Sequence, residues 1–313
     1  MEEHLPPAFD CIILGAGPAG LCASVYAARK MMATLLLGKV LGGQVATYYD
    51  VENYLGFSVI EASDLIARFR EHVDRFGLFR KTGISITAAN LDGPVKSIVT
   101  DEGETFRART LIIATGKRPR TLDIPGEARL TGRGVAFCST CDAPLYRDAD
   151  VAVLGGGNSA LEAAADLCKV ARSVKLFSIG PLTADPFLAE SVGRNEKLVV
   201  FPRHRALEIL GEQSVTGLVV KSLDTGIEAS VAVEGVFVEI GLTPNSELFA
   251  GKLALNPKKE IIVDLACRTS APGVFACGDV TSVPYKQIVT AVGDGAKAAL
   301  SAYHHILGVP PDH

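Results

Sequence analysis

Two glycine-rich turns, each set between an apolar strand and a helix, constrain the fold of this chain more than any other feature. The first lies in "FDCIILGAGPAGLCASVYAARK", where an expected strand over residues 11–14 leads into a turn at 15–20 and a helix over about 21–30. In a GxGxxG turn of this kind, Gly15 permits the bend, Gly17 lets the backbone approach a pyrophosphate, and Gly20 lets the helix pack close to the strand. The phosphate charge then meets the positive end of the helix dipole.

The second turn lies in "DVAVLGGGNSALEAAADLCKV", where residues 155–160 follow an expected strand over residues 151–154 and begin a helix. Its GxGxxA pattern predicts a second pyrophosphate cradle, with nucleotide contacts from Gly155, Gly157, Asn158, Ser159 and Ala160. Because each strand–turn–helix unit binds one dinucleotide, the sequence predicts an α/β protein with two Rossmann-like, three-layer ββα dinucleotide-binding domains.

Length and composition agree with a two-domain globular protein. The chain has 313 residues, 48% of them hydrophobic, and a formal net charge of −4. No segment gathers Lys and Arg as a nucleic-acid-binding surface does, and no apolar run approaches the ~18–20 residues of a membrane span. The start "MEEHLPPAFD" is acidic and lacks the features of a signal peptide. We therefore expect a cytoplasmic protein that binds neither nucleic acid nor a membrane.

The segment "CSTCDAPLY", residues 138–146, contains a CxxC pair. A zinc site needs four ligands, and the sequence offers neither a second CxxC nor a suitable histidine pair, so no metal is expected. A structural disulfide is disfavoured in a reducing cytosol. A redox-active pair is favoured, because two intervening residues allow a small disulfide ring and a CxxC setting lowers a cysteine pKa toward roughly 7. Two dinucleotides and a dithiol together indicate an electron relay from nicotinamide through flavin to disulfide.

The residues that usually bind the two riboses are not evident. The strand "TLLLG", residues 34–38, ends without Asp or Glu, so the ribose contact of the first domain stays unassigned. After "SVKLFS", residues 178–184 contain neither the basic side chain that a 2′-phosphate requires nor the acidic one that a 2′-hydroxyl prefers. Arg194, Arg203 and Arg205 could reach this site only through the fold. We expect NADH rather than NADPH as donor, or a degraded second cradle whose electrons arrive by another route.

The chain as a whole resembles the low-molecular-weight thioredoxin reductases, a family of pyridine nucleotide-disulfide oxidoreductases. The similarity runs from residue 9 to residue 307, with the motifs in the family's order: GAGPAG, GGQ, VENYLGF, IIATG, CSTCD, GGGNSA, EIGLTPN, GVFACGDV and YKQIVTAVGDGAKAA. The C-terminal part also resembles the flavoprotein component of alkyl hydroperoxide reductase. That relative has an added N-terminal thioredoxin-like region, which these 313 residues do not include.

The resemblance implies a split FAD-binding domain, residues 1–118 and 246–313. The nicotinamide-nucleotide domain, residues 119–245, would be inserted between them and carry the CxxC, with a hinge near 117–119 and 243–245. A helix starting at 287–289 would lie beneath the flavin, and Asp279 would hydrogen-bond the ribityl chain. The implied FAD contacts are Gly15, Gly17, Pro18, Ala19, Gly20, Gly42, Gly43, Gln44, Asn53, Ala114, Thr115, Gly116, Gly278, Asp279, Lys286, Gln287, Ile288 and Val289. In the alternative, Asp279 is a turn or capping residue, and Gln287 and Asn53 are ordinary polar loop residues.

The resemblance also assigns roles in the redox pair. Cys141 would face the flavin, Cys138 would attack the disulfide of the partner protein, and Asp142 would act as acid and base unless it merely caps a helix. The implied enzyme is an FAD-dependent protein-disulfide reductase, a homodimer, whose partner is a thioredoxin or a thioredoxin- or glutaredoxin-like protein. The alternatives are a ferredoxin-dependent or nicotinamide-independent flavin thioredoxin reductase, a reductase of a peroxiredoxin system, and an oxygen-using dithiol oxidase.

Overall fold

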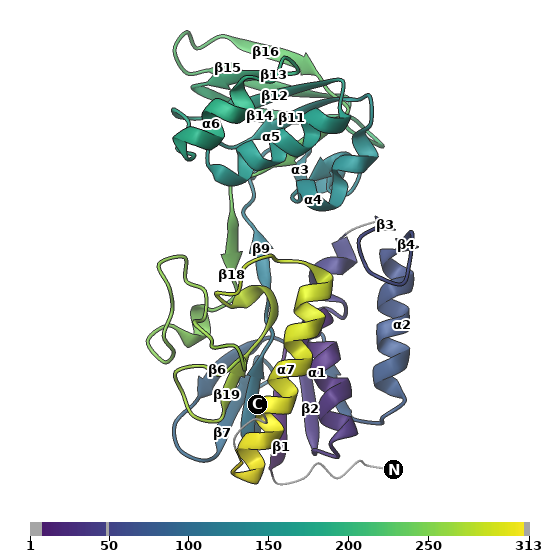
Figure 1. The fold of residues 1–313 in the computed structure, drawn as a ribbon, viewed down its shortest axis with the longest axis vertical. Helices are drawn as coiled ribbons and strands as arrows, with labels where there is room; N and C mark the ends of the chain where they lie inside the picture. The colour runs from purple at the N-terminus through teal and green to yellow at the C-terminus, as the bar shows by residue number, and fades with distance from the viewer. Residues whose placement is uncertain (1–7, 48–49, 310–313) are drawn as a thin grey trace. The chain divides into compact units, whose positions relative to one another are not determined.

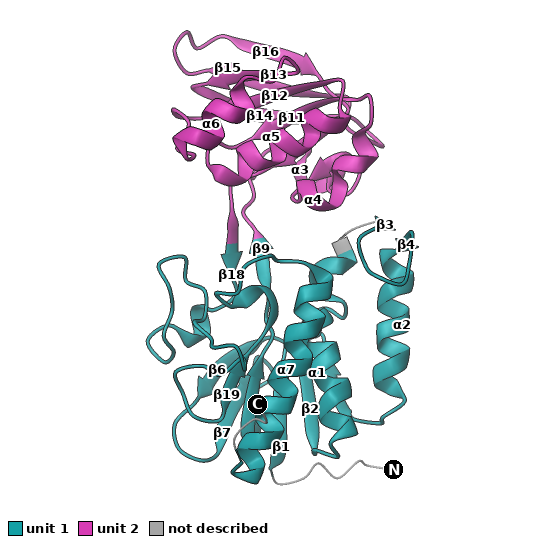
Figure 2. Cartoon of the chain, in the orientation of Figure 1, with its two compact units in different colours: residues 1–118, 243–313 teal, residues 119–242 magenta. Residues whose placement is uncertain are grey.

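The computed structural model describes residues 8–47 and 50–309 and divides into two compact units. Unit 1 comprises Met1–Arg118 and Thr243–His313, and unit 2 comprises Pro119–Leu242 (Figure 2). Unit 2 is therefore inserted in the chain between the two segments of unit 1. The connecting strands β9 (Lys117–Pro119) and β18 (Leu242–Pro244) pair with each other.

Unit 1 is built on a seven-stranded sheet (Figure 1). Five strands run parallel in the order β5-β2-β1-β8-β19. On the other side, β7 pairs antiparallel with β8, and β6 pairs antiparallel with β7. The long strand β8 joins the two parts, because its first half pairs with β7 and its second half with β19. The strands are β1 (Phe9–Leu14), β2 (Thr34–Gly38), β5 (Phe79–Thr82), β6 (Ile86–Asn90), β7 (Lys96–Thr100), β8 (Thr105–Ile113) and β19 (Val274–Ala276).

Both faces of this sheet are buried, which explains why the sequence of β1 is apolar at nearly every position. Cys11 and Ile13 pack in the core cluster that contains residues of α1 (Pro18–Arg29) and α7 (Ile288–Leu307). Ile12 and Leu14 pack in the cluster on the other face. Helix α1 was expected to begin near residue 21 but begins at Pro18, whose fixed φ suits the first helical position.

The remaining elements of unit 1 are short, apart from one helix. Helix α2 (Ala62–Asp74) follows a small hairpin of β3 (Asp50–Val51) and β4 (Ile60–Glu61). Three 3₁₀ turns complete the unit: η1 (Gly43–Thr47), η3 (Glu247–Phe249) and η4 (Gly278–Val280). Helices α1 and α7 lie so close that a Cβ on Gly295 would be 2.2 Å from the carbonyl oxygen of Ala19.

Unit 2, like unit 1, is built on a parallel β-sheet. Its parallel sheet has the order β10-β17-β11-β12-β13, and a separate antiparallel sheet has the order β14-β15-β16. The strands are β10 (Val135–Ala136), β11 (Asp150–Leu154), β12 (Ser173–Ser178), β13 (Leu198–Pro202), β14 (His204–Leu210), β15 (Gly217–Ser222), β16 (Glu228–Ala232) and β17 (Gly235–Val238). The helices are α3 (Glu127–Leu130), α4 (Ser139–Asp142), η2 (Ala143–Tyr146), α5 (Asn158–Val170) and α6 (Pro186–Gly193).

The alternation of side chains along β11 defines three layers in unit 2. Val151 and Val153 pack with residues of α5, whereas Ala152 and Leu154 pack with residues of β14 and β15. The predicted α/β fold with two Rossmann-like units is thus confirmed. Among the helices of residues 8–47 and 50–309, none is both long and apolar enough to cross a bilayer.

Candidate active site

The first glycine turn connects β1 to α1, and glycine is needed at its three positions for different physical reasons. Gly15 has a φ of 114°, and a Cβ there would lie 2.2 Å from the oxygen of Ala114. A Cβ on Gly20 would lie 1.8 Å from the oxygen of Gly15. These two positions must be glycine for the chain to pack upon itself.

Gly17 is different, because the packing of the protein does not require a glycine there. Its φ of −80° is open to any residue, and a Cβ would have as its nearest neighbour the Cα of Gly43, 3.8 Å away. As the N-cap of α1, Gly17 leaves free space at the positive end of the helix dipole. A backbone that must admit a pyrophosphate explains this glycine, so the turn fits the group that was predicted to bind.

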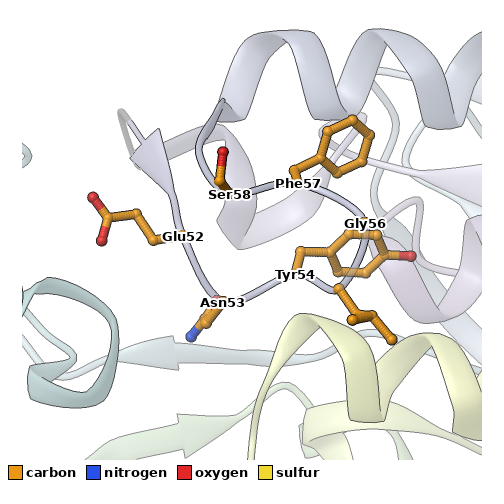
Figure 3. A pocket seen from close by; sticks show the side chains of 7 residues that line it. Glu52, Asn53, Tyr54, Gly56, Phe57 and Ser58 are labelled. Atoms are coloured by element: carbon orange, nitrogen blue, oxygen red, sulfur yellow. The ribbon is translucent and has the colours of Figure 1, made fainter.

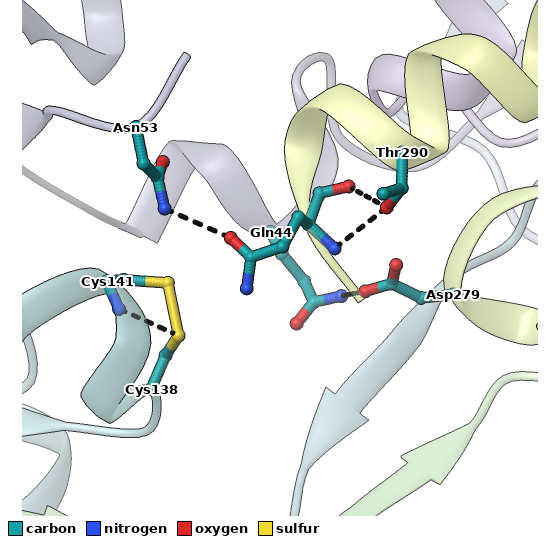
Figure 4. Close-up of a disulfide and its surroundings, with 7 residues drawn as sticks. Gln44, Asn53, Cys138, Cys141, Asp279 and Thr290 are labelled. Carbon is teal, nitrogen blue, oxygen red and sulfur yellow. Dashed lines mark hydrogen bonds between the residues drawn. A yellow bond between two sulfur atoms is a disulfide. The ribbon is translucent and has the colours of Figure 1, made fainter. Parts of the chain in front are cut away.

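The segment with Gly42, Gly43 and Gln44 lies against this turn. The amide of Gly42 donates to the oxygen of Ala16 at 2.8 Å, and Gly43 has a φ of 58° close to Gly17. The side-chain amide of Gln44 donates to Asp279 at 3.3 Å, as Figure 4 shows. Burial raises the pKa of Asp279, while the positive charges of Lys286 and Lys117 act in the opposite direction.

The strand end at Ala114, Thr115 and Gly116 is fixed by a residue far away in the chain. The hydroxyl of Thr115 donates to the oxygen of Asn245 at 2.7 Å, and the side-chain amide of Asn245 donates to the oxygen of Thr115 at 2.8 Å. The backbone amide of Asn245 donates to the oxygen of Gly116 at 3.0 Å. The residues that follow β8 are therefore held rigidly next to the first glycine turn.

Helix α7 begins as expected at Ile288, with Gln287 as its N-cap. Gln287 and Thr290 form a reciprocal capping box, in which each side chain bonds the backbone of the other. The side chain of Gln287 also accepts a hydrogen bond of 3.0 Å from Asn53 (Figure 4). Asn53 belongs to a loop, residues 52–58, that surrounds a small open pocket (Figure 3). Asn53 and Gln287 are thus bonded to each other.

Two further positions of unit 1 bear on the predicted contacts. The ammonium of Lys286 donates to the oxygen of Thr281 at 2.6 Å and so fixes the loop before α7. Strand β2 ends at Gly38, where a Cβ would lie 2.8 Å from Ala16. No side chain fits at that position, which accounts for the lack of an acidic residue at the end of this strand.

The second glycine turn connects β11 to α5 and repeats the features of the first. A Cβ on Gly155 would lie 2.3 Å from the oxygen of Glu239, whereas a Cβ on Gly157 would meet its nearest neighbour, the hydroxyl of Thr183, only at 4.0 Å. Gly157 is therefore also free of any packing requirement, as a pyrophosphate cradle demands. Ser159 donates to the oxygen of Glu239 at 3.4 Å, and Ala160 is buried.

The segment that follows β12 folds onto this second turn. The amide of Thr183 donates to the oxygen of Gly156 at 2.7 Å, and the amide of Asp185 donates to the side chain of Asn158 at 2.8 Å. The hydroxyl of Ser178 donates a hydrogen bond of 2.7 Å to the oxygen of Gly180 within the same segment. Residues 178–185 thus border the second glycine turn without placing a basic side chain there.

Cys138 and Cys141 form a disulfide at the start of α4, with 5.4 Å between their Cα atoms. Cys138 is the N-cap, and its sulfur accepts a hydrogen bond of 3.2 Å from the amide of Cys141 (Figure 4). Pro144 lies in the first turn of η2, where its missing N–H costs no helical hydrogen bond. A cysteine at a helix N-terminus that accepts a backbone hydrogen bond is stabilised as a thiolate when the disulfide opens.

Asp142 follows the pair and carries a perturbed carboxyl group. Burial raises its pKa to about 6. It occupies the N-cap position of η2, but its side chain makes no capping hydrogen bond. The side chain of Asp142 therefore does not act as the cap of this turn, which was the alternative role. A carboxyl with a pKa near neutrality next to a dithiol suits proton transfer.

Sequence reasoning missed several residues that shape these sites. Asn245 and Glu239 both lie in the EIGLTPN motif, to which the sequence alone assigns no role. Thr183 and Asp185 lie in the segment after β12. In the sequence, that segment was considered only for a basic or acidic side chain that could bind the ribose of the nucleotide. No local pattern reveals their partners, which come from distant parts of the chain. Within the described residues, no group of three or more His, Cys, Asp or Glu side chains is arranged to hold a metal ion.

Comparison with known proteins agrees with this geometry. Residues 9–295 match the family model for pyridine nucleotide-disulphide oxidoreductases. The F component of alkyl hydroperoxide reductase from Pseudomonas putida is 42% identical over 96% of this chain, which spans 58% of that relative's length. Thioredoxin reductases from Streptococcus pyogenes and Giardia duodenalis superpose with TM-scores of 0.92 and 0.90, at 33% and 30% identity. Each alignment covers 96% of this chain and 99% of the other.

The cofactors follow from the family and from the two glycine turns, each of which leaves space for a pyrophosphate. The chain therefore belongs to the pyridine nucleotide-disulphide oxidoreductase family and is a flavin disulfide reductase that uses FAD and a nicotinamide nucleotide.

Proposed function

We propose that this protein is a thioredoxin reductase-like enzyme that transfers electrons from NADH to the disulfide of a thioredoxin- or glutaredoxin-like protein. One observation carries the proposal: a CxxC disulfide at a helix start, followed by a half-buried carboxyl, in a chain with two pyrophosphate-type glycine turns. FAD accepts and donates the electron pair when bound. We also assign the enzyme to the cytoplasm and expect it to be a homodimer.

In this proposal unit 1 holds FAD and unit 2 holds the nicotinamide nucleotide. The pyrophosphate of FAD lies at the turn of residues 15–20, bordered by residues 42–44, 114–116 and 278–279. Residues 286–289 and Asn53 orient the flavin through the start of α7. The nucleotide lies at the turn of residues 155–160. The free space at Gly17 and Gly157 supports both assignments.

Cys138 is assigned as the cysteine that attacks the partner. As a thiolate it displaces one sulfur of the partner disulfide and forms a mixed disulfide. The thiolate of Cys141 then attacks the Cys138 sulfur, which restores the internal disulfide and releases the second partner thiol. Asp142 supplies a proton to a leaving thiolate and regains one from solvent. The hydrogen bond from the Cys141 amide to the Cys138 sulfur supports the choice of nucleophile.

The donor is assigned as NADH because the second turn lacks a cation for a 2′-phosphate. Residues 178–185 border that turn and contain no Lys or Arg. Two of the three arginines that could have reached it are ion-paired elsewhere: Arg194 with Glu190, and Arg203 with Asp224. A 2′-phosphate would thus bring its charge to a site without a compensating partner.

Rapid mixing of the oxidised enzyme with NADH, NADPH or reduced ferredoxin tests the donor. We expect NADH to bleach the flavin absorbance fastest. Reduction by ferredoxin alone would contradict the NADH assignment and favour the nicotinamide-independent alternative. Turnover with oxygen at a rate equal to that with a protein disulfide would favour the dithiol oxidase.

A trapping experiment tests the roles of the two cysteines. The variant Cys141→Ser keeps the attacking thiol but cannot resolve the mixed disulfide, so it should retain an oxidised thioredoxin as a covalent complex. Cys138→Ser is the matched control and should trap nothing. The reverse pattern on a non-reducing gel would overturn the assignment.

A reductase of a peroxiredoxin system is the second candidate, because the relative from Pseudomonas putida is a component of alkyl hydroperoxide reductase. In that case the immediate partner is still a thioredoxin-like disulfide, which passes the electrons to a peroxiredoxin. Peroxide consumption by enzyme, NADH and a peroxiredoxin is compared with and without added thioredoxin. Consumption that proceeds without thioredoxin would favour direct reduction of the peroxiredoxin.

A further inference from the structure

Thr183 borders the space that the second glycine turn leaves open. A Cβ built on Gly157 would have the hydroxyl oxygen of Thr183 as its nearest neighbour, 4.0 Å away. The proposed function assigns this same space to the pyrophosphate of the nicotinamide nucleotide. A hydrogen-bonding side chain therefore lies at the edge of the position where the nucleotide carries its negative charge.

The fold holds Thr183 firmly in this position. Its backbone amide donates to the oxygen of Gly156 at 2.7 Å, which ties the segment to the turn itself. The residues on either side, Leu182 and Ala184, pack against the core cluster that contains residues of β11 and α5. Thr183 stands between these two anchors and is exposed. The location of its hydroxyl is thus set by packing on both sides.

The hydroxyl of Thr183 is poorly used inside the protein. It donates to the oxygen of Gly156 at 3.3 Å, which is long for a hydrogen bond between oxygens. That oxygen already accepts the amide of Thr183 at the shorter distance. Turning the hydroxyl toward a phosphate oxygen would exchange this weak bond for a charge-assisted one and would leave Gly156 with a partner.

The first glycine turn is crossed by a segment in the same way, but without a side-chain donor at this place. There the amide of Gly42 donates to the oxygen of Ala16 at 2.8 Å, and the Cα of Gly43 is the nearest neighbour of a Cβ on Gly17. Unit 2 has a threonine where unit 1 has two glycines. Since residues 178–185 contain no Lys or Arg, this hydroxyl is a donor that the segment can offer to a phosphate.

We propose that Thr183 is a nucleotide-binding residue, whose hydroxyl donates a hydrogen bond to the pyrophosphate of the nicotinamide nucleotide. The inference rests on the proposed function, because it takes the turn of residues 155–160 as the site of that nucleotide. NADH and NADPH share the pyrophosphate, so the hydroxyl contributes affinity and does not discriminate between them.

The test measures binding of ADP-ribose to the oxidised enzyme with FAD bound, by isothermal titration calorimetry. ADP-ribose keeps the pyrophosphate and lacks the nicotinamide, so no electrons are transferred. Thr183→Val keeps the shape of the side chain and removes the hydroxyl, and the dissociation constant should rise roughly tenfold, as for a lost hydrogen bond to a charged group. Thr183→Ser keeps the hydroxyl and should bind nearly as tightly as the wild type.

Thr216→Val is the matched control, because it removes an exposed threonine of unit 2 between β14 and β15. It should bind ADP-ribose like the wild type. Urea unfolding without nucleotide should not separate the variants, since each change lies at the surface. Equal affinity of Thr183→Val and the wild type would overturn the inference, and so would a Thr183→Ser variant as weak as Thr183→Val. A wild-type enzyme that binds no ADP-ribose would overturn the assigned nucleotide site as well, so the two failures are distinguishable.

Discussion

Replacing Gly17 by alanine is expected to abolish tight FAD binding without unfolding the protein. The backbone at Gly17 has φ −80° and ψ −177°, which alanine adopts without strain. The new methyl group would have its nearest protein atom 3.8 Å away. In the FAD-free protein we therefore expect a free energy of unfolding that is unchanged or higher by about 0.4–1 kcal/mol, because alanine reduces the entropy of the unfolded chain.

The new methyl group should instead weaken the complex with FAD. It would occupy the space through which the backbone approaches the pyrophosphate, and overpacking of this kind costs about 1–3 kcal/mol. The affinity for FAD should fall by roughly ten- to a hundredfold. Gly20→Ala is the contrasting variant, since its Cβ would lie 1.8 Å from the backbone oxygen of Gly15.

The assay compares both variants with the wild type after removal and re-addition of FAD. Urea unfolding of the FAD-free proteins gives their stability, and flavin fluorescence quenching gives the affinity. Gly17→Ala should fold and bind weakly, whereas Gly20→Ala should lose stability even without FAD. A Gly17→Ala protein that binds FAD as tightly as the wild type would refute the assignment of this turn to the pyrophosphate.

Three further perturbations give expectations that can be measured. Lys117→Met leaves the buried Glu260 carboxylate with a hydrogen bond from Asn256 at 2.6 Å and with Lys286 at 3.9 Å as its remaining ion pair among the described residues. Urea unfolding should therefore show a loss of about 3 kcal/mol, and adding Glu260→Leu should restore most of it. Asp142→Asn should slow reduction of the partner disulfide by about a hundredfold and remove the inflection near pH 6 from the rate profile. The folded state holds the Glu239 proton from its ordinary pKa of 4.5 up to about 8, so the free energy of unfolding should fall as the pH rises through that window. The fall should not exceed about 1.4 kcal/mol per pH unit and should be absent in Glu239→Gln by urea titration at each pH.

The elements that the sequence predicted well are those with a local physical signal. Both strand–turn–helix units follow from glycines that the backbone itself requires, as at Gly15 and Gly155. The start of α7 at Ile288 was implied by the family resemblance, and the capping box of Gln287 and Thr290 that fixes it is also a local feature. Such signals depend only on neighbouring residues, so they can be read without knowledge of the fold.

The contacts that the sequence did not reveal join residues far apart in the chain. Lys117 bonds Glu260, which is 143 residues away, and Thr115 bonds Asn245 at a separation of 130. Ser159 donates to the backbone oxygen of Glu239, which is 80 residues away. Each pair depends on the packing of separate elements, which hydrophobic periodicity does not encode. The motif EIGLTPN marked Glu239 and Asn245 as notable but could not supply their partners.

An anaerobic reductive titration measures whether electrons pass between bound FAD and the Cys138–Cys141 disulfide. The electrons taken up per chain are counted from the flavin absorbance as dithionite is added. The wild type should take up twice as many electrons as its flavin alone can accept, and both cysteines should then be alkylated. A double variant with serine at both positions should take up only the flavin's share. A wild-type protein that takes up no more than this variant, with its disulfide intact, would contradict the account.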